Sequence, residues 1–220
     1  MKSTIGRFAA VILAASMLFA PVSRADDRRA GSGQVLYHYV GRVKLNFATG
    51  TATILGYFTH LEGVPASASM FSGAPGESTA YFTFRADTPF QALAGNGDLG
   101  GGVFAVSPVL ITPGDIKMYF SASPAHSWDN PDSFSPGQPI ATFARQLEQL
   151  ALIGPIGTNT ASAVLTSSTK FDFGGVQLDL ARLLPVGVTN VTTGNNAPLA
   201  GSNAATVIFA FAGYGLAFGN

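Results

Sequence analysis

Two groups of side chains could carry acid–base chemistry, and the first is the pair His60 and Glu62. They lie in Thr51 to Glu62, a segment with the alternation of a β-strand, so we expect both on the face that also carries Ile54 and Phe58. A carboxylate beside an imidazole can fix its tautomer and exchange a proton with it, which makes the pair a candidate catalytic couple. The same spacing also occurs at strand ends as a polar rim without a catalytic role.

The second group lies in the longest polar segment, residues 121–139. It contains His126, Trp128, Asp129 and Asp132. Loops of this length often carry function, and a large aromatic side chain beside carboxylates could close over the mouth of a binding site. The turn-forming Asn, Pro, Ser and Gly residues around them support a purely structural loop as a second interpretation. The carboxylate spacing matches no calcium loop, so we expect no metal site.

The composition excludes several classes of chemistry. The chain of 220 residues has no Cys, which removes disulfides, thiolate nucleophiles and iron–sulfur clusters. Its 12 basic residues are balanced by 12 acidic ones, so no positive excess is available to bind nucleic acid. A glycine-rich tract over residues 95–102 matches a dinucleotide motif by letter, but no helix pattern follows it. We therefore expect neither a cofactor nor a nucleic-acid partner.

The N-terminal residues have the three parts of a secretory signal. Lys2 and Arg7 precede an apolar run over residues 8–19, and the small residues Ser23 and Ala25 follow it. We expect cleavage after Ala25 and a secreted or periplasmic protein. The run is shorter than the roughly 20 residues that span a bilayer as a helix, so no stable membrane anchor is expected. The predicted organisation is a signal peptide (1–25), a polar leader (26–33) and a single β-barrel domain (34–220).

Alternation of apolar and polar residues predicts several β-strands. The segments are Val35 to Phe47, Thr51 to Glu62, Ser78 to Ala86, Asp115 to Ser121, Ala161 to Phe173, Val176 to Ala181, Val186 to Thr192 and Thr206 to Phe218. Gly50 and the pair Gly174 and Gly175 stand at short connections, where glycine can adopt the positive φ that hairpin turns require. Consecutive strands are therefore expected to pair antiparallel.

One segment, Ile140 to Leu152, is ambiguous. Its apolar residues Ile140, Phe143, Leu147 and Leu150 have the spacing of one helix face, and it is rich in good helix formers. The pattern alone favours a helix nearly as strongly as a strand.

Many short strands between glycine- and proline-rich turns indicate an all-β protein with at most one helix. We predict an antiparallel β-barrel of about 8–10 strands in up-and-down order, since closure removes the exposed sheet edges. A β-sandwich is the alternative fold. A small outer-membrane barrel is a further alternative, although several segments are shorter than the roughly 10 residues of such strands.

The stretch from Asp129 to Phe143, with the sequence DNPDSFSPGQPIATF, resembles a segment of an uncharacterised family of small secreted bacterial proteins. In that family an aromatic strand lies upstream, like Ala80 to Phe84 here, and a glycine-rich hairpin lies downstream, like Phe173 to Gly175. The resemblance implies a bacterial exported protein and a strand at Ile140 to Leu152, and it brings no catalytic residues. At the level of architecture the expected barrel is similar to those of allene oxide cyclases and dirigent proteins, which bind apolar precursors inside.

Three functional hypotheses follow. The first is a barrel that binds an apolar small molecule, with a lining drawn from Tyr37, Tyr39, Phe47, Phe82, Phe84, Met118, Phe120 and Trp128. Plain core packing is the competing interpretation of these residues. The second is an enzyme of the cyclase or isomerase type, which would need one of the two acid–base groups, His60 with Glu62 or His126 with Asp129 and Asp132, to point into the cavity. The third is a structural or interaction protein of the cell envelope, and the oligomeric state is left open.

Overall fold

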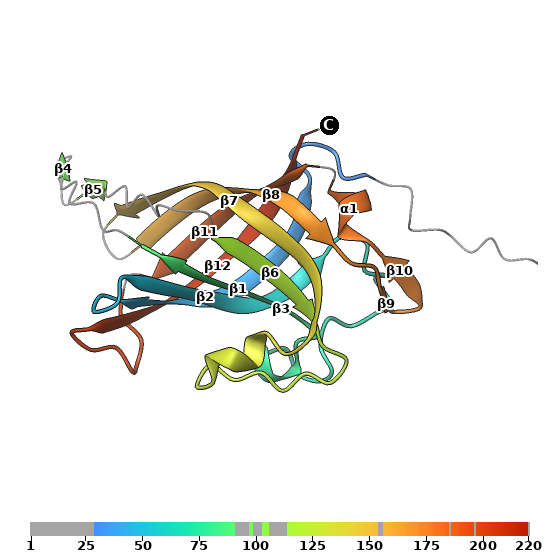
Figure 1. The fold of residues 1–220 in the computed structure, drawn as a ribbon, viewed down its shortest axis with the longest axis horizontal. Coiled ribbons are helices and arrows are strands. Elements are labelled where there is room, and N and C mark those ends of the chain that lie inside the picture. Colours follow the sequence, from blue (N-terminus) through green and yellow to red (C-terminus); the bar gives the residue numbers. More distant parts are fainter. Residues whose placement is uncertain are drawn as a thin grey trace, which may run out of the picture.

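Eight antiparallel strands close into a barrel (Figure 1). The computed structural model describes residues 29–90, 97–98, 103–105, 114–153, 156–184, 186–195 and 197–219, and the predicted signal peptide lies outside these residues. The barrel strands are β1 (Val35–Asn46), β2 (Thr51–Leu61), β3 (Phe82–Pro89), β6 (Asp115–Phe120), β7 (Gln138–Ile153), β8 (Ile156–Ser168), β11 (Gly187–Asn195) and β12 (Thr206–Phe218). Each pairs with the next of these strands, and β12 pairs with β1 to close the sheet. The predicted all-β antiparallel barrel is confirmed, and the alternative sandwich is wrong.

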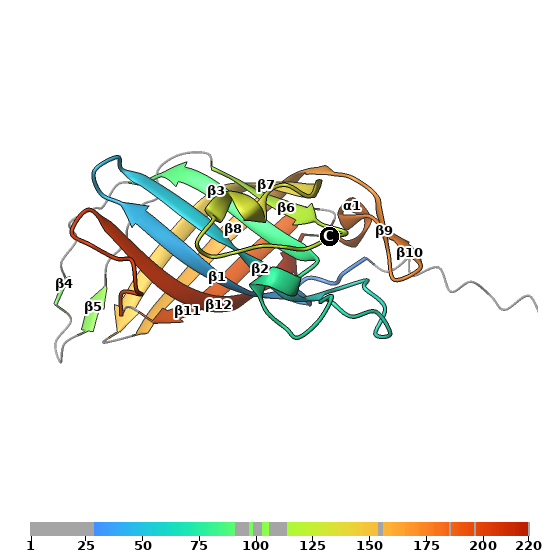
Figure 2. The same ribbon diagram turned by 90° about the horizontal axis from the view of Figure 1, so that it is seen from below.

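The two ends of the barrel differ, as Figures 1 and 2 show. At one end, which we call the packed end, lie the hairpin of β9 (Phe171–Phe173) and β10 (Val176–Leu178) and the short helix α1 (Leu180–Leu183). At the other end, the hairpin end, lie the β1–β2, β7–β8 and β11–β12 connections. There β5 (Val103–Ala105) pairs with the end of β7, and β4 (Gly97–Asp98) pairs with β5.

Among the described residues, α1 is the one α-helix, and none of the helices is long and apolar enough to cross a membrane.

Aromatic and leucine side chains fill the packed end. Phe82, Phe120 and Phe171 lie with ring centroids 5.4 to 5.7 Å apart, and Leu180 is 1% exposed. Helix α1 is held in place by Asp179, whose side chain accepts hydrogen bonds from Ala181 N at 3.0 Å and from Ser168 Oγ at 2.8 Å. The packed end is therefore a conventional hydrophobic core.

The structure changes the bounds of several predicted strands. The strand predicted over Val176 to Ala181 ends at Leu178, since Leu180–Leu183 form helix α1. β3 begins at Phe82 and not at Ser78, because residues Glu77–Thr79 form a 3₁₀ turn. The segment predicted from Ala161 to Phe173 is divided, since β8 ends at Ser168 and β9 begins at Phe171. The predicted glycine turn is confirmed, with φ of 62° at Gly174 and 79° at Gly175 between β9 and β10.

The ambiguous segment is strand β7, as the family resemblance implied, and not a helix. Its pairing with β6 shifts register at Ile140, an extra residue between Pro139 and Ala141, and its pairing with β8 shifts between Thr142 and Phe143 and between Arg145 and Leu147. A β-bulge adds a residue and so changes which side chains face the core. Ile140 and Phe143 are both 1% exposed although they are three residues apart, a spacing that regular alternation does not allow. The helix-like pattern is thus the pattern of a bulged strand.

Candidate functional site

The barrel encloses a cavity of about 550 Å³ to which all eight strands contribute. Apolar side chains of β1, β2, β3 and β6 form one wall, namely Val43, Leu45, Ile54, Phe58, Phe84 and Met118. The cavity opens at the hairpin end, because Phe47 and Asn195, which also line it, are exposed there. The volume lies within the range of about 300–1,000 Å³ that is typical of small-molecule pockets.

The opposite wall is built from small and uncharged polar residues of β8 and β11. They are Gly157, Ala161, Ala163, Asn190, Thr192 and Gly194. The interior of an eight-stranded barrel is only just wide enough for its own side chains to fill. Short side chains along one wall therefore leave the space that larger residues would occupy, and plain core packing does not fill this barrel.

Two tyrosines of β1 reach across β12 to the polar wall. The hydroxyl of Tyr37 donates to Asn190 Oδ1 at 2.8 Å, and the hydroxyl of Tyr39 shares a hydrogen bond of 2.6 Å with Thr192 Oγ1. These hydrogen bonds pair both tyrosine hydroxyls, the Asn190 amide oxygen and the Thr192 hydroxyl within the protein. A buried polar wall without such partners would bind water instead.

Burial governs the chemistry of Tyr37. Removal from water raises the pKa of its hydroxyl well above the ordinary value, and the neighbouring Tyr39 adds to the shift. Tyr37 therefore stays neutral throughout the physiological range. It supplies an aromatic face and a hydrogen bond, and it is a poor proton acceptor or donor for catalysis.

Arg145 on β7 is the one charged side chain among the described residues that line the cavity. Its Nε and Nη2 atoms are buried, and its guanidinium lies beside Gly114, where a Cβ atom would come within 3.0 Å of Nη2. The sequence does not reveal this residue, because the helix-like spacing of the segment does not show which side chains face inward. Phe143 and Arg145 have the same parity, and both fall on the inner face after the extra residue Ile140 in the pairing with β6.

Five of the residues predicted to line a ligand site are among those that line the cavity, namely Tyr37, Tyr39, Phe47, Phe84 and Met118. Phe82 and Phe120 do not, because they pack in the core of the packed end. Trp128 lies outside the barrel, with its ring 6.1 Å from that of Tyr57 and the guanidinium carbon of Arg42 4.5 Å from its centre.

His60 and Glu62 lie on the surface near the packed end. His60 Nε2 is 3.8 Å from Glu62 Oε2, and their side chains are 49% and 36% exposed. The prediction that His60 shares the face of Phe58 is wrong. The pairing of β1 with β2 shifts register between His38 and Tyr39, and this bulge turns Phe58 inward and leaves His60 exposed.

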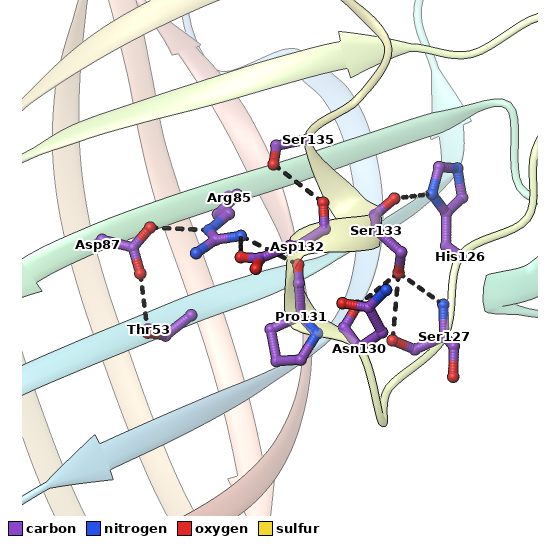
Figure 3. A network of polar contacts seen from close by, with 10 residues as sticks. All are labelled: Thr53, Arg85, Asp87, His126, Ser127, Asn130, Pro131, Asp132, Ser133 and Ser135. Atoms are coloured by element: carbon purple, nitrogen blue, oxygen red, sulfur yellow. Dashed lines mark hydrogen bonds and ion pairs between the residues drawn. The ribbon is translucent and has the colours of Figure 1, made fainter.

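The loop that carries His126, Asp129 and Asp132 folds against the outer wall and not over the cavity mouth (Figure 3). Its centre is a 3₁₀ turn over Pro131–Phe134, in which Ser133 Oγ accepts from Ser127 N at 2.8 Å and donates to Asn130 O at 2.6 Å. His126 is buried and its Nδ1 hydrogen-bonds with Ser133 O.

Contacts between this loop and β3 fix its position. Arg85 Nη1 donates to Asp132 Oδ1 at 2.6 Å, and Thr83 Oγ1 donates to Phe134 O at 2.8 Å in a buried hydrogen bond. The loop therefore buries Thr83, which is 1% exposed although it lies on the outer wall. Asp132 and His126 lie on the outer side of the barrel wall (Figure 3), and neither they nor Asp129 are among the residues that line the cavity.

The described residues contain no group of three or more His, Asp or Glu side chains that could hold a metal ion.

Comparison with known proteins finds no matching family model, no matching curated protein and no matching solved structure. The resemblance to small secreted bacterial proteins therefore stays a prediction, and the functional argument rests on the cavity itself.

Proposed function

We propose that the protein binds an apolar small molecule inside its barrel. The observation that carries the proposal is an open cavity of about 550 Å³ whose lining is mainly aliphatic and aromatic. Apolar surface of this kind is unfavourable in contact with water, so a ligand that covers it gains roughly 25 cal/mol for each Å² of apolar area removed from solvent. The hydrogen-bonded Tyr–Asn and Tyr–Thr pairs leave few polar groups that would favour water over such a ligand.

The lining is rigid enough to be selective. Ring centroids of Tyr37 and Phe58 are 5.1 Å apart, those of Phe58 and Phe84 5.3 Å, and those of Tyr39 and Phe84 5.6 Å. Packed aromatic pairs of this kind hold the wall in one shape. Little reorganisation is then needed on binding, which favours affinity.

The outer surface of β1, β2, β3 and β6 supports a barrel that faces water. Lys44, Arg85, Asp87 and Lys117 alternate with the lining residues and lie outside. Charged side chains on a lipid-facing surface cost about 2–4 kcal/mol each near the centre of a bilayer. These strands therefore suit a water-exposed binding protein better than an outer-membrane barrel.

A titration with N-phenyl-1-naphthylamine, an uncharged apolar dye whose fluorescence rises when it leaves water, tests the proposal. We expect saturable binding to the wild-type protein. Ala161→Phe, which places a ring in the cavity, should abolish it, and Ala161→Leu should weaken it. Thr160→Phe places the same ring on the exposed side of β8 and is the matched control. Absence of wild-type binding, or equal binding by folded Ala161→Phe protein, would contradict the proposal.

We also propose that the protein is exported. The support is the three-part signal in residues 1–25. N-terminal sequencing of the protein recovered from its host tests this, with Asp26 expected as the first residue. A chain that retains Met1 or begins elsewhere in the apolar run would contradict cleavage after Ala25.

A further inference from the structure

We infer that the ligand carries an anionic group, such as a carboxylate or sulfonate, which pairs with Arg145 while its apolar body fills the cavity. The inference rests on the proposed function, because it concerns the same cavity. It assigns to the ligand a chemical class, an anionic amphiphile, that an apolar lining alone does not specify.

The first support is the charge of the lining. Arg145 is cationic, and no Asp or Glu is found among the described residues that line the cavity. A guanidinium keeps its charge at any physiological pH and has five N–H donors, so it can bind a ligand anion while it also contacts the protein. In a cavity with few polar groups, attraction between opposite charges is stronger than in water.

The second support is the way β7 places this side chain. Register shifts in the β7–β8 pairing stand on both sides of Arg145, one between Thr142 and Phe143 and one between Arg145 and Leu147. Bulges disrupt the ladder and are found next to functional sites, where they redirect a side chain. In the pairing with β6, Ile140 is the extra residue between Pro139 and Ala141, and this bulge changes the inward-facing parity of β7 from that of Ile140 to that of Phe143 and Arg145.

The third support is the surroundings of the guanidinium. The backbone N–H of Arg145 donates to Gly114 O at 3.3 Å, and a Cβ atom at Gly114 would lie 2.7 Å from Thr88 Oγ1 and 3.0 Å from Arg145 Nη2. Glycine at 114 thus leaves room for the guanidinium beside β3. This side chain is thereby placed among the residues that line the cavity.

Two dyes that differ by one group test the inference. Anilinonaphthalene sulfonate is N-phenyl-1-naphthylamine with an added sulfonate. Arg145→Met keeps an apolar stem but removes the charge, and we expect it to lower affinity for the sulfonate dye by about tenfold or more while binding of the neutral dye is retained. Arg145→Lys keeps a positive charge and should keep part of the higher affinity for the sulfonate dye. Lys44→Met removes a positive charge from the exposed outer face of β1 and should change neither affinity.

A comparison on the wild-type protein needs no variant at Arg145. We expect hexadecanoate to displace the neutral dye at a lower concentration than hexadecanol does, and this difference to vanish in Arg145→Met. Equal displacement by the acid and the alcohol in the wild type would overturn the inference and leave the proposed function intact. Failure of the neutral dye to bind at all would instead contradict the proposed function, so the two failures are distinguishable.

Discussion

The ring of Tyr37 on β1 occupies the space in which a side chain at Gly215 on β12 would stand. A Cβ atom at residue 215 would lie 2.4 Å from both Cε2 and Cζ of Tyr37. Tyr37, Gly215 and Asn190 are register partners on β1, β12 and β11, so the tyrosine spans the glycine and reaches Asn190 with its hydroxyl. Gly213 repeats the arrangement under Tyr39, which reaches Thr192. The two glycines of β12 thereby leave room for the tyrosine rings of β1 to cross β12 and reach β11.

Gly215→Ala should destabilise the fold by about 1–3 kcal/mol, because the new methyl group overlaps the Tyr37 ring. Tyr37→Leu should relieve part of this loss in the double variant, which gives a coupling energy of about 0.5–3 kcal/mol in urea unfolding. Gly31→Ala is the control, since a Cβ atom there meets nothing within 4 Å. Additive losses in the double variant would show that the ring and the glycine do not depend on each other.

Alkaline pH should destabilise the protein through Tyr37. Burial raises the pKa of this hydroxyl above its ordinary value of 10.0, so below that pH both the folded and the unfolded chain keep the proton. Above it the unfolded chain loses the proton first, and the free energy of unfolding falls as pH rises toward the folded pKa. Tyr37→Phe should make the fall between about pH 9 and pH 11 less steep. Part of the fall remains, because burial also raises the pKa of Tyr57 and Tyr119. An unchanged slope in the variant would contradict this prediction.

Thr83→Val should cost about 1–3 kcal/mol, because it leaves the buried carbonyl of Phe134 without its hydrogen bond. Thr53→Val removes an exposed hydrogen bond of the same 2.8 Å length to Asp87 and should change stability by less than about 0.5 kcal/mol. Urea unfolding gives both values, and the fluorescence of Trp128, the single tryptophan, reports whether the loop stays on the wall. Equal losses of stability in the two variants would contradict a larger contribution from the buried hydrogen bond.

His60→Ala and Glu62→Ala should leave dye binding unchanged. Both side chains are exposed outside the barrel, and an ion pair at 3.8 Å on the surface contributes at most about 1 kcal/mol. Titration of both variants with the neutral dye checks this. A loss of binding in a folded His60→Ala protein would move the site to the packed end and restore the acid–base hypothesis.

The fold could be predicted because its determinants are local. Alternation in Thr206 to Phe218 and the glycine turns at Gly50 and Gly174 specify strands and hairpins from a few neighbouring residues, and the structure confirms them. The bulges could not be predicted in this way. The extra residues Thr59 in β2 and Ile140 in β7 reverse which alternate side chains face inward, so His60 points outward and Arg145 points inward against regular alternation.

The cavity could be predicted only in part. Tyr37 and Tyr39 stand out as aromatic residues on the apolar face of a strand, but what makes their wall is contact with residues about 150 positions later in the chain. The prediction that Trp128 lines the cavity is wrong for a related reason. Nothing near it in sequence indicates that its loop packs on Tyr57 and Phe134 at the outer wall.

A crystal structure of the protein with bound N-phenyl-1-naphthylamine tests the central claim most directly. We predict density for the dye inside the barrel, in contact with Phe58, Met118 and Ala161, with the Tyr37–Asn190 hydrogen bond intact. Saturable binding with density only on the outer surface, or a barrel interior filled by its own side chains, would contradict the claim.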